Sequence, residues 1–411
     1  MNKKTAIIII IITILVLAGG FLWFYFSKLA PQDEDVDIGT PTDPIFPSSG
    51  GSSNGGGTNT GGSSGGTSGG TNSKLRQISA TPVAGAVIFE EEPEEEDEEG
   101  DIVIRYVDRG LGHIFETNTE DFSQQRISGR TLPKIYEALW QGSGKGVIMR
   151  YIDENEDIAT FQGFVDETAE NEEQALVGGF LQSDIPFITV SPNGNSIFYL
   201  SETSTGVSGI RASFSGGSRA EIFNSPLRSW IIDWPTDGTV SVSSAPGNNV
   251  PGSMFLVNSS NGNITPVLSS ISGLTGNVSP DGNYVLYTES SNLTLQTFLY
   301  DISSGTTQTM PFATLPEKCT WYEGDSLSLY CAVPIPPPRA DYPDAWYQGR
   351  VSFDDDLWRY EIESELFEFV LNTKQESGED MDITDIQIDG RESYLIFTNK
   401  KDLSLWSLEI N

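Results

Sequence analysis

Short runs of alternating apolar and polar residues, each preceded by turn residues, recur through most of the chain. In "SPDGNYVLYTES" (279–290) proline, aspartate and glycine precede the run, and "SPNGNSIFYLSE" (191–202) repeats the arrangement. Proline fixes φ in a turn and glycine adopts the left-handed conformation, so that two strands can be joined tightly. Alternation is the pattern of a strand with one buried face. Each of these segments therefore predicts a β-hairpin.

An equivalent glycine marks seven such hairpins at nearly constant spacing. The glycines are residues 100, 146, 194, 238, 282, 324 and 390, so the steps are 46, 48, 44, 44, 42 and 66 residues. The first two units also match in detail, since "VIRYVD" (103–108) and "IMRYID" (148–153) lie 45 positions apart. A period of about 40–50 residues with four short strands per unit is typical of a β-propeller. The sequence predicts an all-β fold of seven blades, with six or eight blades as alternatives.

The last unit has only three strand patterns, around "ITDIQI", "SYLIFT" and "LSLWSLEI". A further strand pattern, "KLRQIS" (74–79), precedes the first strand of the first blade, "GAVIF". We expect this N-terminal strand to supply the missing outer strand of the seventh blade. The predicted propeller then spans residues 74–411, and its ring is closed by the two ends of the repeat region.

The first residues of the chain predict a membrane anchor. The segment "TAIIIIIITILVLAGGFLWFYF" (5–26) is 22 residues long and uncharged, which is enough for a helix across the hydrocarbon core. Two lysines precede it, and Trp23 and Tyr25 suit the outer interface. We therefore expect residues 1–27 to be a short cytoplasmic N-terminus and a single transmembrane helix. Cleavage as a signal peptide is the alternative, and both place the C-terminal head outside the cytoplasm.

Residues 28–73 differ from both neighbouring regions. They are rich in proline and aspartate and then in glycine, serine and threonine, as in "SSGGSSNGGGTNTGGSSGGTSGGTN". Such a segment has too few apolar residues to offset the entropy of ordering. We expect a flexible linker that tethers the head at the cell membrane.

Charge narrows the classes of partner. The chain has 58 acidic and 23 basic residues, a formal net charge of -35. Such a surface repels phosphate backbones and anionic headgroups, so we expect no nucleic-acid binding and no peripheral lipid docking. The run "EEEPEEEDEE" (90–99) lies inside the first hairpin. It is interpreted as a solvated loop, with a site for a basic partner or a cation as the alternative.

Few residues point to chemistry. His113 is the only histidine, and neither a "GxSxG" elbow within residues 74–411 nor a cluster of Cys/His ligands accompanies it. The segment "DENEDI" (153–158) begins like a calcium loop, but Ile158 and Phe164 stand where glycine and the bidentate glutamate are required. We therefore expect no catalytic residues, cofactor or metal. The alternative is a pair of carboxylates in the central channel that cleaves glycosides, because acidic residues are abundant.

Cys319 and Cys331 flank the turn of "WYEGDSLSLY" and should face each other on adjacent antiparallel strands. Outside the cytoplasm such a pair can oxidise to a disulfide, with two buried thiols as the alternative.

The step of 66 residues reflects an insertion, "VPIPPPRADYPDAWYQGRVSFDDD" (333–356), between the second and third strands of blade six. Prolines stiffen it, while Tyr342, Trp346 and Tyr347 offer amphipathic surface. These three aromatics are the candidate anchors for a partner. The alternative is that they fold back over the edge of the blade.

The "SPDG" and "SPNG" hairpins and the strand "FLYDISSG" resemble WD-repeat-like propellers of the kind found in TolB and in dipeptidyl peptidases. The resemblance is strongest over residues 185–310 and implies the fold. TolB-like proteins also carry a small α/β domain, and the peptidases a hydrolase domain; we expect neither here. The sequence therefore predicts a single-pass, extracytoplasmic propeller that binds or scaffolds proteins, with a surface hydrolase as the alternative.

Overall fold

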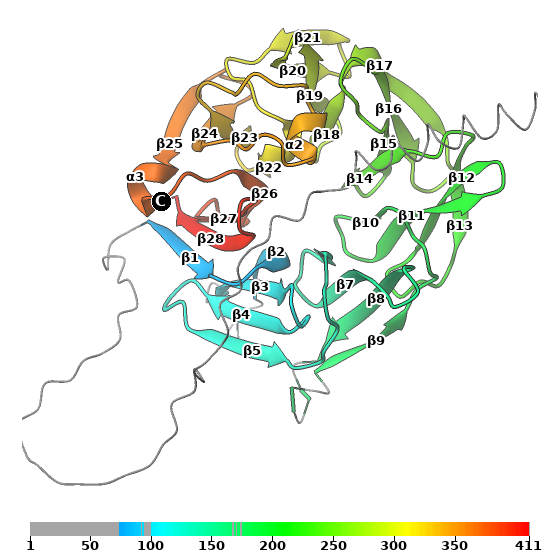
Figure 1. Ribbon diagram of the computed structural model, residues 1–411, viewed down its shortest axis with the longest axis vertical. Helices are drawn as coiled ribbons and strands as arrows, with labels where there is room; N and C mark the ends of the chain where they lie inside the picture. The colour runs from blue at the N-terminus through cyan, green and yellow to red at the C-terminus, as the bar shows by residue number, and fades with distance from the viewer. Residues whose placement is uncertain are drawn as a thin grey trace, which may run out of the picture. The chain divides into compact units, whose positions relative to one another are not determined.

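Seven antiparallel sheets of four strands each are arranged as blades around a central channel (Figure 1). The structure is a computed structural model, and it describes residues 74–91, 93, 100–166, 168–169, 171–172 and 175–410. The predicted anchor and linker, residues 1–73, lie outside the described residues. Within the described part of the chain, no helix has the length and apolar character needed to cross a membrane.

The blades follow one another along the chain, and within each blade the strands run in order from the channel to the rim. The first four blades are β2 (Val83–Glu90), β3 (Ile102–Asp108), β4 (Ile114–Asn118) and β5 (Gln124–Ser128); β6 (Glu137–Trp140), β7 (Gly146–Ile152), β8 (Ile158–Val165) and β9 (Leu176–Phe180); β10 (Ile188–Val190), β11 (Ser196–Thr203), β12 (Gly206–Ser213) and β13 (Ala220–Ser225); and β14 (Trp230–Thr236), β15 (Thr239–Ser244), β16 (Pro251–Asn258) and β17 (Ile264–Ser272). The last three are β18 (Thr275–Val278), β19 (Tyr284–Ser291), β20 (Thr294–Asp301) and β21 (Thr306–Thr309); β22 (Cys319–Glu323), β23 (Leu327–Pro334), β24 (Asp355–Glu361) and β25 (Phe367–Asn372); and β26 (Ile383–Ile388), β27 (Tyr394–Asn399), β28 (Ser404–Glu409) and β1 (Leu75–Ser79).

The ring is closed by the first strand of the propeller, as the sequence predicts. β1 pairs antiparallel with β28, with Leu75 opposite Leu408 and Gln77 opposite Trp406. Both ends of the propeller therefore belong to the seventh blade, where the backbone N–H of Glu409 donates to the carbonyl of Lys74 (2.9 Å). The seven-bladed count and the all-β class are both confirmed.

The repeated turn motif has a local physical cause. Gly282 adopts a φ of +73°. The hydroxyl of Ser279 accepts a hydrogen bond from the backbone N–H of Tyr284 (2.9 Å), and the carboxylate of Asp281 accepts one from the N–H of Asn283 (3.0 Å). These side chains satisfy backbone donors that the turn leaves without strand partners. The "SPNG" turn uses its serine and asparagine in the same way.

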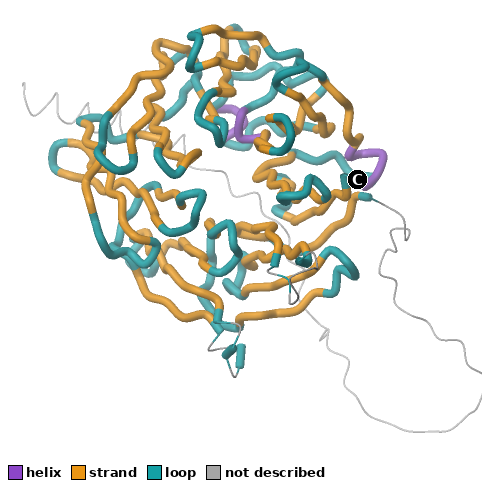
Figure 2. Tube along the Cα trace, turned by 180° about the vertical axis from the view of Figure 1, so that it is seen from behind, coloured by secondary structure: helices purple, strands orange, loops and turns teal. Residues whose placement is uncertain are grey.

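The buried core is distributed between neighbouring blades. One cluster joins Tyr330 and Leu357 of blade six to Leu395 and Phe397 of blade seven, and all four are buried. Equivalent clusters join blades one and two and blades three and four. Each blade thus buries its faces against the next blade. Figure 2 shows that the described helices are confined to short segments, including α2 (Asp344–Tyr347) and α3 (Thr373–Ser377), with a single turn η1 (Pro316–Lys318) between blades five and six.

Because the strands of each blade alternate in direction, the loops divide between two faces. We call the face formed by the turns between first and second and between third and fourth strands the hairpin face. The opposite face holds the connections between second and third strands and the links between blades. It also carries residues 335–354 of blade six, and we call it the insertion face. The chain enters β1 at Lys74, on the hairpin face.

Candidate functional site

The insertion of blade six folds down onto the propeller, which corrects the expectation for two of its aromatic residues. Tyr342 and Trp346 are only 1% and 4% exposed and pack with Leu315 and Phe353 in one apolar cluster. The Trp346 and Phe353 rings are stacked with centroids 6.3 Å apart. These side chains fold back over the blade, which was the alternative, because large aromatic surfaces gain more from burial than from exposure. They are not available as anchors.

A buried lysine holds the base of the insertion. Lys318, fully buried in η1, places its ammonium 2.7 Å from the carboxylate of Asp355 and 2.6 Å from that of Asp382, and it donates to the carbonyl of Ile383 (2.7 Å). Asp382 also accepts from the indole N–H of Trp346 (3.0 Å). Charges without access to water are stable only when they are paired and hydrogen-bonded. The cluster therefore fixes the insertion to blades six and seven.

The two carboxyls of this cluster have opposite pKa shifts. Burial raises the pKa of Asp355 to about 6, against the opposing effect of Lys318. Burial also opposes ionisation of Asp382, but Lys318 and hydrogen bonds from Trp346 and Phe353 hold its pKa below the usual range. The difference follows from hydrogen bonding, since Oδ1 of Asp355 has no partner among the described residues. The sequence gives little sign of the cluster, because Lys318 ends η1, Asp355 begins β24 and Asp382 precedes β26.

Contacts to blades four, five and seven complete the cover that the insertion forms. The side chain of Asn248 from blade four donates to the carboxylate of Asp341 (2.9 Å), and the hydroxyl of Ser290 from blade five donates to the carbonyl of Tyr342 (2.7 Å). Lys400 of blade seven donates to the carbonyl of Trp346. The insertion is therefore an ordered part of the insertion face.

Tyr347 is the one predicted anchor that remains at the surface. Its side chain is 40% exposed, and its hydroxyl donates to the carboxylate of Glu317. Burial raises the pKa of Glu317, and the hydrogen bond from Tyr347 opposes that rise. A role for Tyr347 in binding stays a prediction.

The two faces of the propeller differ in chemistry. Exposed large apolar side chains on the insertion face come from six of its loops, namely Leu111, Phe187, Leu227, Val250, Leu293, Ile335 and Tyr347. In the described loops of the hairpin face, Leu366 is the single residue of this kind. That face instead carries exposed acidic residues, among them Asp101, Glu120, Asp121, Asp237, Asp281, Asp325, Glu363 and Glu365. The insertion face also carries exposed acidic residues, such as Glu154 and Asp184, so the two faces differ in their exposed apolar side chains.

The central channel contains a cavity of about 510 Å³ between the inner strands of blades one, two, three and seven. Its wall includes the carboxylates of Glu137 and Asp385 and the aromatic rings of Tyr136 and Trp140. Glu137 is paired with the buried guanidinium of Arg150. Asp385 is exposed to the channel, where desolvation by the surrounding walls, and then the charge of Glu137, raise its pKa. The structure therefore brings together two carboxyls from blades two and seven that the sequence does not single out.

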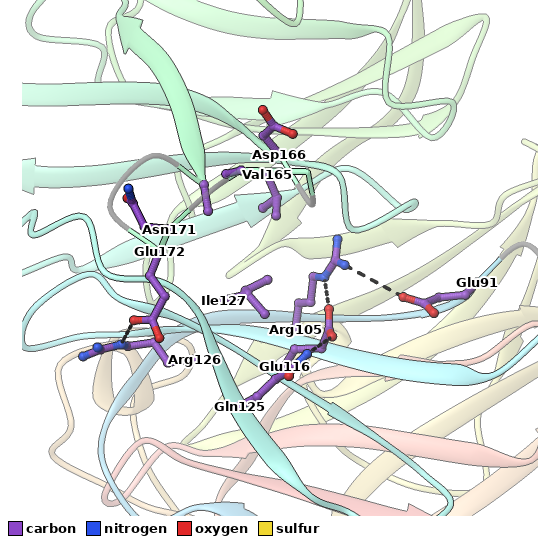
Figure 3. A pocket seen from close by; sticks show the side chains of 12 residues that line it. Glu91, Arg105, Glu116, Gln125, Arg126, Ile127, Val165, Asp166, Asn171 and Glu172 are labelled. Carbon is purple, nitrogen blue, oxygen red and sulfur yellow. Dashed lines mark hydrogen bonds and ion pairs between the residues drawn. The ribbon is translucent and has the colours of Figure 1, made fainter.

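A second pocket, of about 460 Å³, lies at the junction of blades one and two (Figure 3). The buried guanidinium of Arg105 lies 2.6 Å from the carboxylate of Glu116 and 3.9 Å from that of Glu91. At the rim, Arg126 pairs with Glu172 (2.5 Å). The basic groups of this pocket are thus neutralised within the chain, and the Arg126–Glu172 pair joins the two blades.

The remaining sequence candidates have ordinary structural roles. The ring of His113 lies 3.4 Å from the hydroxyl of Thr131. Asp153 accepts hydrogen bonds from the backbone N–H groups of Asn155 (2.8 Å) and Asp157 (3.0 Å), so it stabilises its own turn. Among the residues that the structure describes, no group of three or more His, Cys, Asp or Glu is arranged to hold a metal ion.

The two cysteines form a bridge across blade six. Cys319 of β22 lies directly opposite Cys331 of β23, with a Cα–Cα distance of 4.1 Å, and the structure joins them in a disulfide. Both residues are buried in the cluster between blades five and six. The bridge therefore reinforces the inner strands beneath the insertion.

Comparison with solved structures defines the class of protein. An oligogalacturonate lyase from Vibrio parahaemolyticus is 11% identical, with coverage of 83% of this chain and 94% of that chain and a TM-score of 0.52. TolB from Acinetobacter baumannii is 10% identical over 73% of this chain, with a TM-score of 0.41, and the tricorn protease is 10% identical over 75%, with a TM-score of 0.48. This chain spans 60% of the length of that TolB and 32% of the tricorn protease.

No protein-family model matches the sequence, and no curated protein matches it either. The similar structures include a protease and lyases, and at this identity they establish the fold alone. The chain thus has the TolB-like seven-bladed propeller fold that its hairpin motifs resemble.

Proposed function

We propose that this protein is a binding module that recognises another protein through the insertion face. The observation that carries the proposal is the division of the surface, since exposed apolar side chains gather in the loops of that face. Contiguous apolar surface in a soluble domain commonly marks an interaction site. The ordered insertion covers several blades and gives this surface a fixed shape. A surface that is already ordered loses less conformational entropy when a partner binds.

The position of the chain entry supports a surface-displayed arrangement. We propose that residues 1–27 anchor the protein in the cell membrane and that residues 28–73 tether the propeller outside the cytoplasm. The tether joins the propeller at Lys74, on the acidic hairpin face. Because the tether is attached on the hairpin face, the insertion face is expected to be open to a partner.

Proximity labelling in the native cell tests the proposal with two matched pairs of substitutions. Leu227→Glu with Val250→Glu places two charges on the insertion face, whereas Ile264→Glu with Leu366→Glu places two on the opposite side at equally exposed positions. We expect the variant with the first pair of substitutions to lose the labelling of some proteins that the parent and the variant with the second pair both label. Identical labelling by all three proteins, at equal abundance, would contradict binding through the insertion face.

The cavity of the channel favours a second candidate function, which is glycoside hydrolysis. Glu137 and Asp385 line the same cavity, and the raised pKa of Asp385 suits a proton donor. In this reaction water adds across the glycosidic bond, with one carboxyl protonating the leaving oxygen. The hydrolase function is supported if the parent protein releases reducing ends from oligosaccharides and Asp385→Asn does not. If the parent releases none from neutral or acidic oligosaccharides, the hydrolase function is rejected and the binding module remains.

A further inference from the structure

The buried cluster at the base of the insertion holds an amine and two carboxyls together without access to solvent. Nζ of Lys318 lies 2.7 Å from Oδ2 of Asp355 and 2.6 Å from Oδ1 of Asp382, and the three side chains are 0%, 0% and 2% exposed. The rings of Trp346 and Phe353 enclose the nitrogen, with centroids 5.3 and 5.0 Å away. Well-oriented groups in one molecule react with effective molarities of about 10⁵–10⁸ M. The cluster therefore favours any reaction that an amine and a carboxyl can undergo, and that reaction is condensation to an amide.

The two oxygens of the Asp355 carboxyl have different surroundings. Oδ2 accepts a hydrogen bond from the backbone N–H of Ile383 (2.8 Å) as well as one from Lys318. Oδ1 is buried and has no hydrogen-bond partner in the part of the chain that the structure describes. An N–H that points at a carbonyl oxygen stabilises the negative charge that develops there when a nucleophile adds to the carbon. Oδ2 is therefore placed to remain as the carbonyl oxygen of an amide, and Oδ1 is placed to leave as water.

Asp382 is placed to move the protons of such a condensation. Its carboxylate accepts hydrogen bonds from the indole N–H of Trp346 (3.0 Å) and the backbone N–H of Phe353 (3.1 Å). Burial opposes its ionisation, but Lys318 and these hydrogen bonds hold the pKa of Asp382 below its usual range, so that it is ionised and acts as a base toward the ammonium. Burial raises the pKa of Asp355 to about 6, which favours the neutral acid with which an amine condenses. The cluster thus contains a nucleophile, an electrophile and a base.

We propose that Lys318 and Asp355 become joined by an isopeptide bond that forms within the folded protein. Asp382 takes a proton from the ammonium, and Nζ then attacks Cγ of the protonated Asp355. Asp382 passes its proton to Oδ1, which leaves as water when the Cγ–Oδ1 bond breaks, and it takes a second proton from the nitrogen. Of the four protons at the start, three on the ammonium and one on Asp355, the amide keeps one, the water two and Asp382 one. No oxidant, reductant or other reactant is needed. The remaining amide N–H has an acceptor in the carbonyl of Ile383, which lies 2.7 Å from Nζ.

The bond joins η1 to the start of β24. It closes the chain from residue 318 to residue 355 into a loop that contains all of the insertion, residues 335–354. The insertion is then held by a covalent link as well as by its buried contacts, which restricts its local unfolding. Chains that have not yet condensed keep the ion pairs, so the titration of Asp355 and the stability of the ion pairs are properties of those chains. The bond uses none of the exposed side chains of the insertion face, so it does not depend on the proposed function.

Tryptic peptide mapping of the full-length protein, folded, stored and then reduced and alkylated, tests the proposal. Cleavage after Arg350 and Arg359 releases peptide 351–359, which contains Asp355. We expect this peptide to be joined to the peptide that contains Lys318, with a mass lower than the sum of the two by one water molecule. Fragment ions of the joined peptides should place the link at Lys318 and Asp355.

Two lysine variants provide matched controls. Lys318→Met lacks the amine, so its peptide 351–359 should appear free and with its full mass. Lys401→Met should keep the link, because Lys401 forms only an exposed ion pair with Asp354 (2.6 Å), where water competes for both groups. The parent decides the proposal even if Lys318→Met does not fold, since the linked peptides either are present in the parent or are not.

Three results would overturn the proposal. The first is a parent that releases peptide 351–359 only in its free form at full mass. The second is a free peptide 351–359 that has lost water, since this is dehydration within one peptide and leaves Lys318 unlinked. The third is a link that persists in Lys318→Met, or one that fragment ions assign to Asp382 or to another aspartate in place of Asp355.

Discussion

Replacement of Lys318 by methionine is the most direct test of how the insertion is held. The side chain is fully buried and its ammonium contacts Asp355, Asp382 and the carbonyl of Ile383 at 2.6–2.7 Å. Methionine fills similar space but leaves two buried carboxyls without a cation. Loss of one partner from a buried ion pair costs about 3–5 kcal/mol. We expect a loss of stability of this size at pH 7.

The expected change in melting temperature follows from this loss of stability and from the size of the propeller. An unfolding entropy of about 2.1 cal/mol/K per residue gives roughly 0.7 kcal/mol/K for a propeller that spans residues 74–410. Lys318→Met should therefore lower the melting temperature by about 4–7 °C in a calorimetric scan at pH 7. At pH 5 the loss should be smaller, because carboxyls that have lost their cation take up protons and become neutral.

A lysine on the same face provides the matched control. Lys401 forms an exposed ion pair with Asp354 at 2.6 Å, and such pairs contribute about 1 kcal/mol or less. Lys401→Met should therefore lower the melting temperature by no more than about 1–2 °C. The reasoning is refuted if Lys318→Met melts as the control does at pH 7, or if its loss is the same at pH 5 and pH 7.

Three further predictions concern the ring, the disulfide and the buried carboxyl. A chain that begins at Thr81 lacks β1 and exposes the edge of β28, so it should melt lower and aggregate more than one that begins at Ser73; equal melting temperatures would contradict the closure. Intact-mass analysis of alkylated, unreduced protein should show no label on Cys319 or Cys331, and reduction should cost about 3 kcal/mol of stability; two labels would show free thiols. Because the pKa of Asp355 is raised to about 6 in the folded protein, its contribution to stability is full below about pH 4 and is lost as the pH rises through 6, by up to roughly 3 kcal/mol. Asp355→Asn should remove this dependence in melting curves from pH 4 to 7, and an unchanged pH profile would show that another group titrates.

The sequence by itself determined the blades, because each blade is specified by local rules. Alternation sets which face of a strand is buried, and a turn such as that at Ser279 to Gly282 uses only residues within a few positions of one another. The spacing of these turns gave the count of seven. The missing outer strand of the last blade left β1 as its natural partner, so the closure also followed from the repeat.

Only the tertiary structure decided what the long insertion does. Whether Trp346 is exposed or buried depends on a lysine between blades five and six and an aspartate between blades six and seven, and no local pattern records that they meet. The presence of Glu137 and Asp385 in one cavity has the same origin, since one belongs to the second blade and the other to the seventh. The outer strand β9 is an intermediate case. Its sequence lacks charges, but its position at the outer edge of a blade is set by the ring. Contacts between loops of different blades depend on how the blades are arranged around the channel. A repeat sequence specifies each blade, but it does not specify which loop residues of one blade contact those of another.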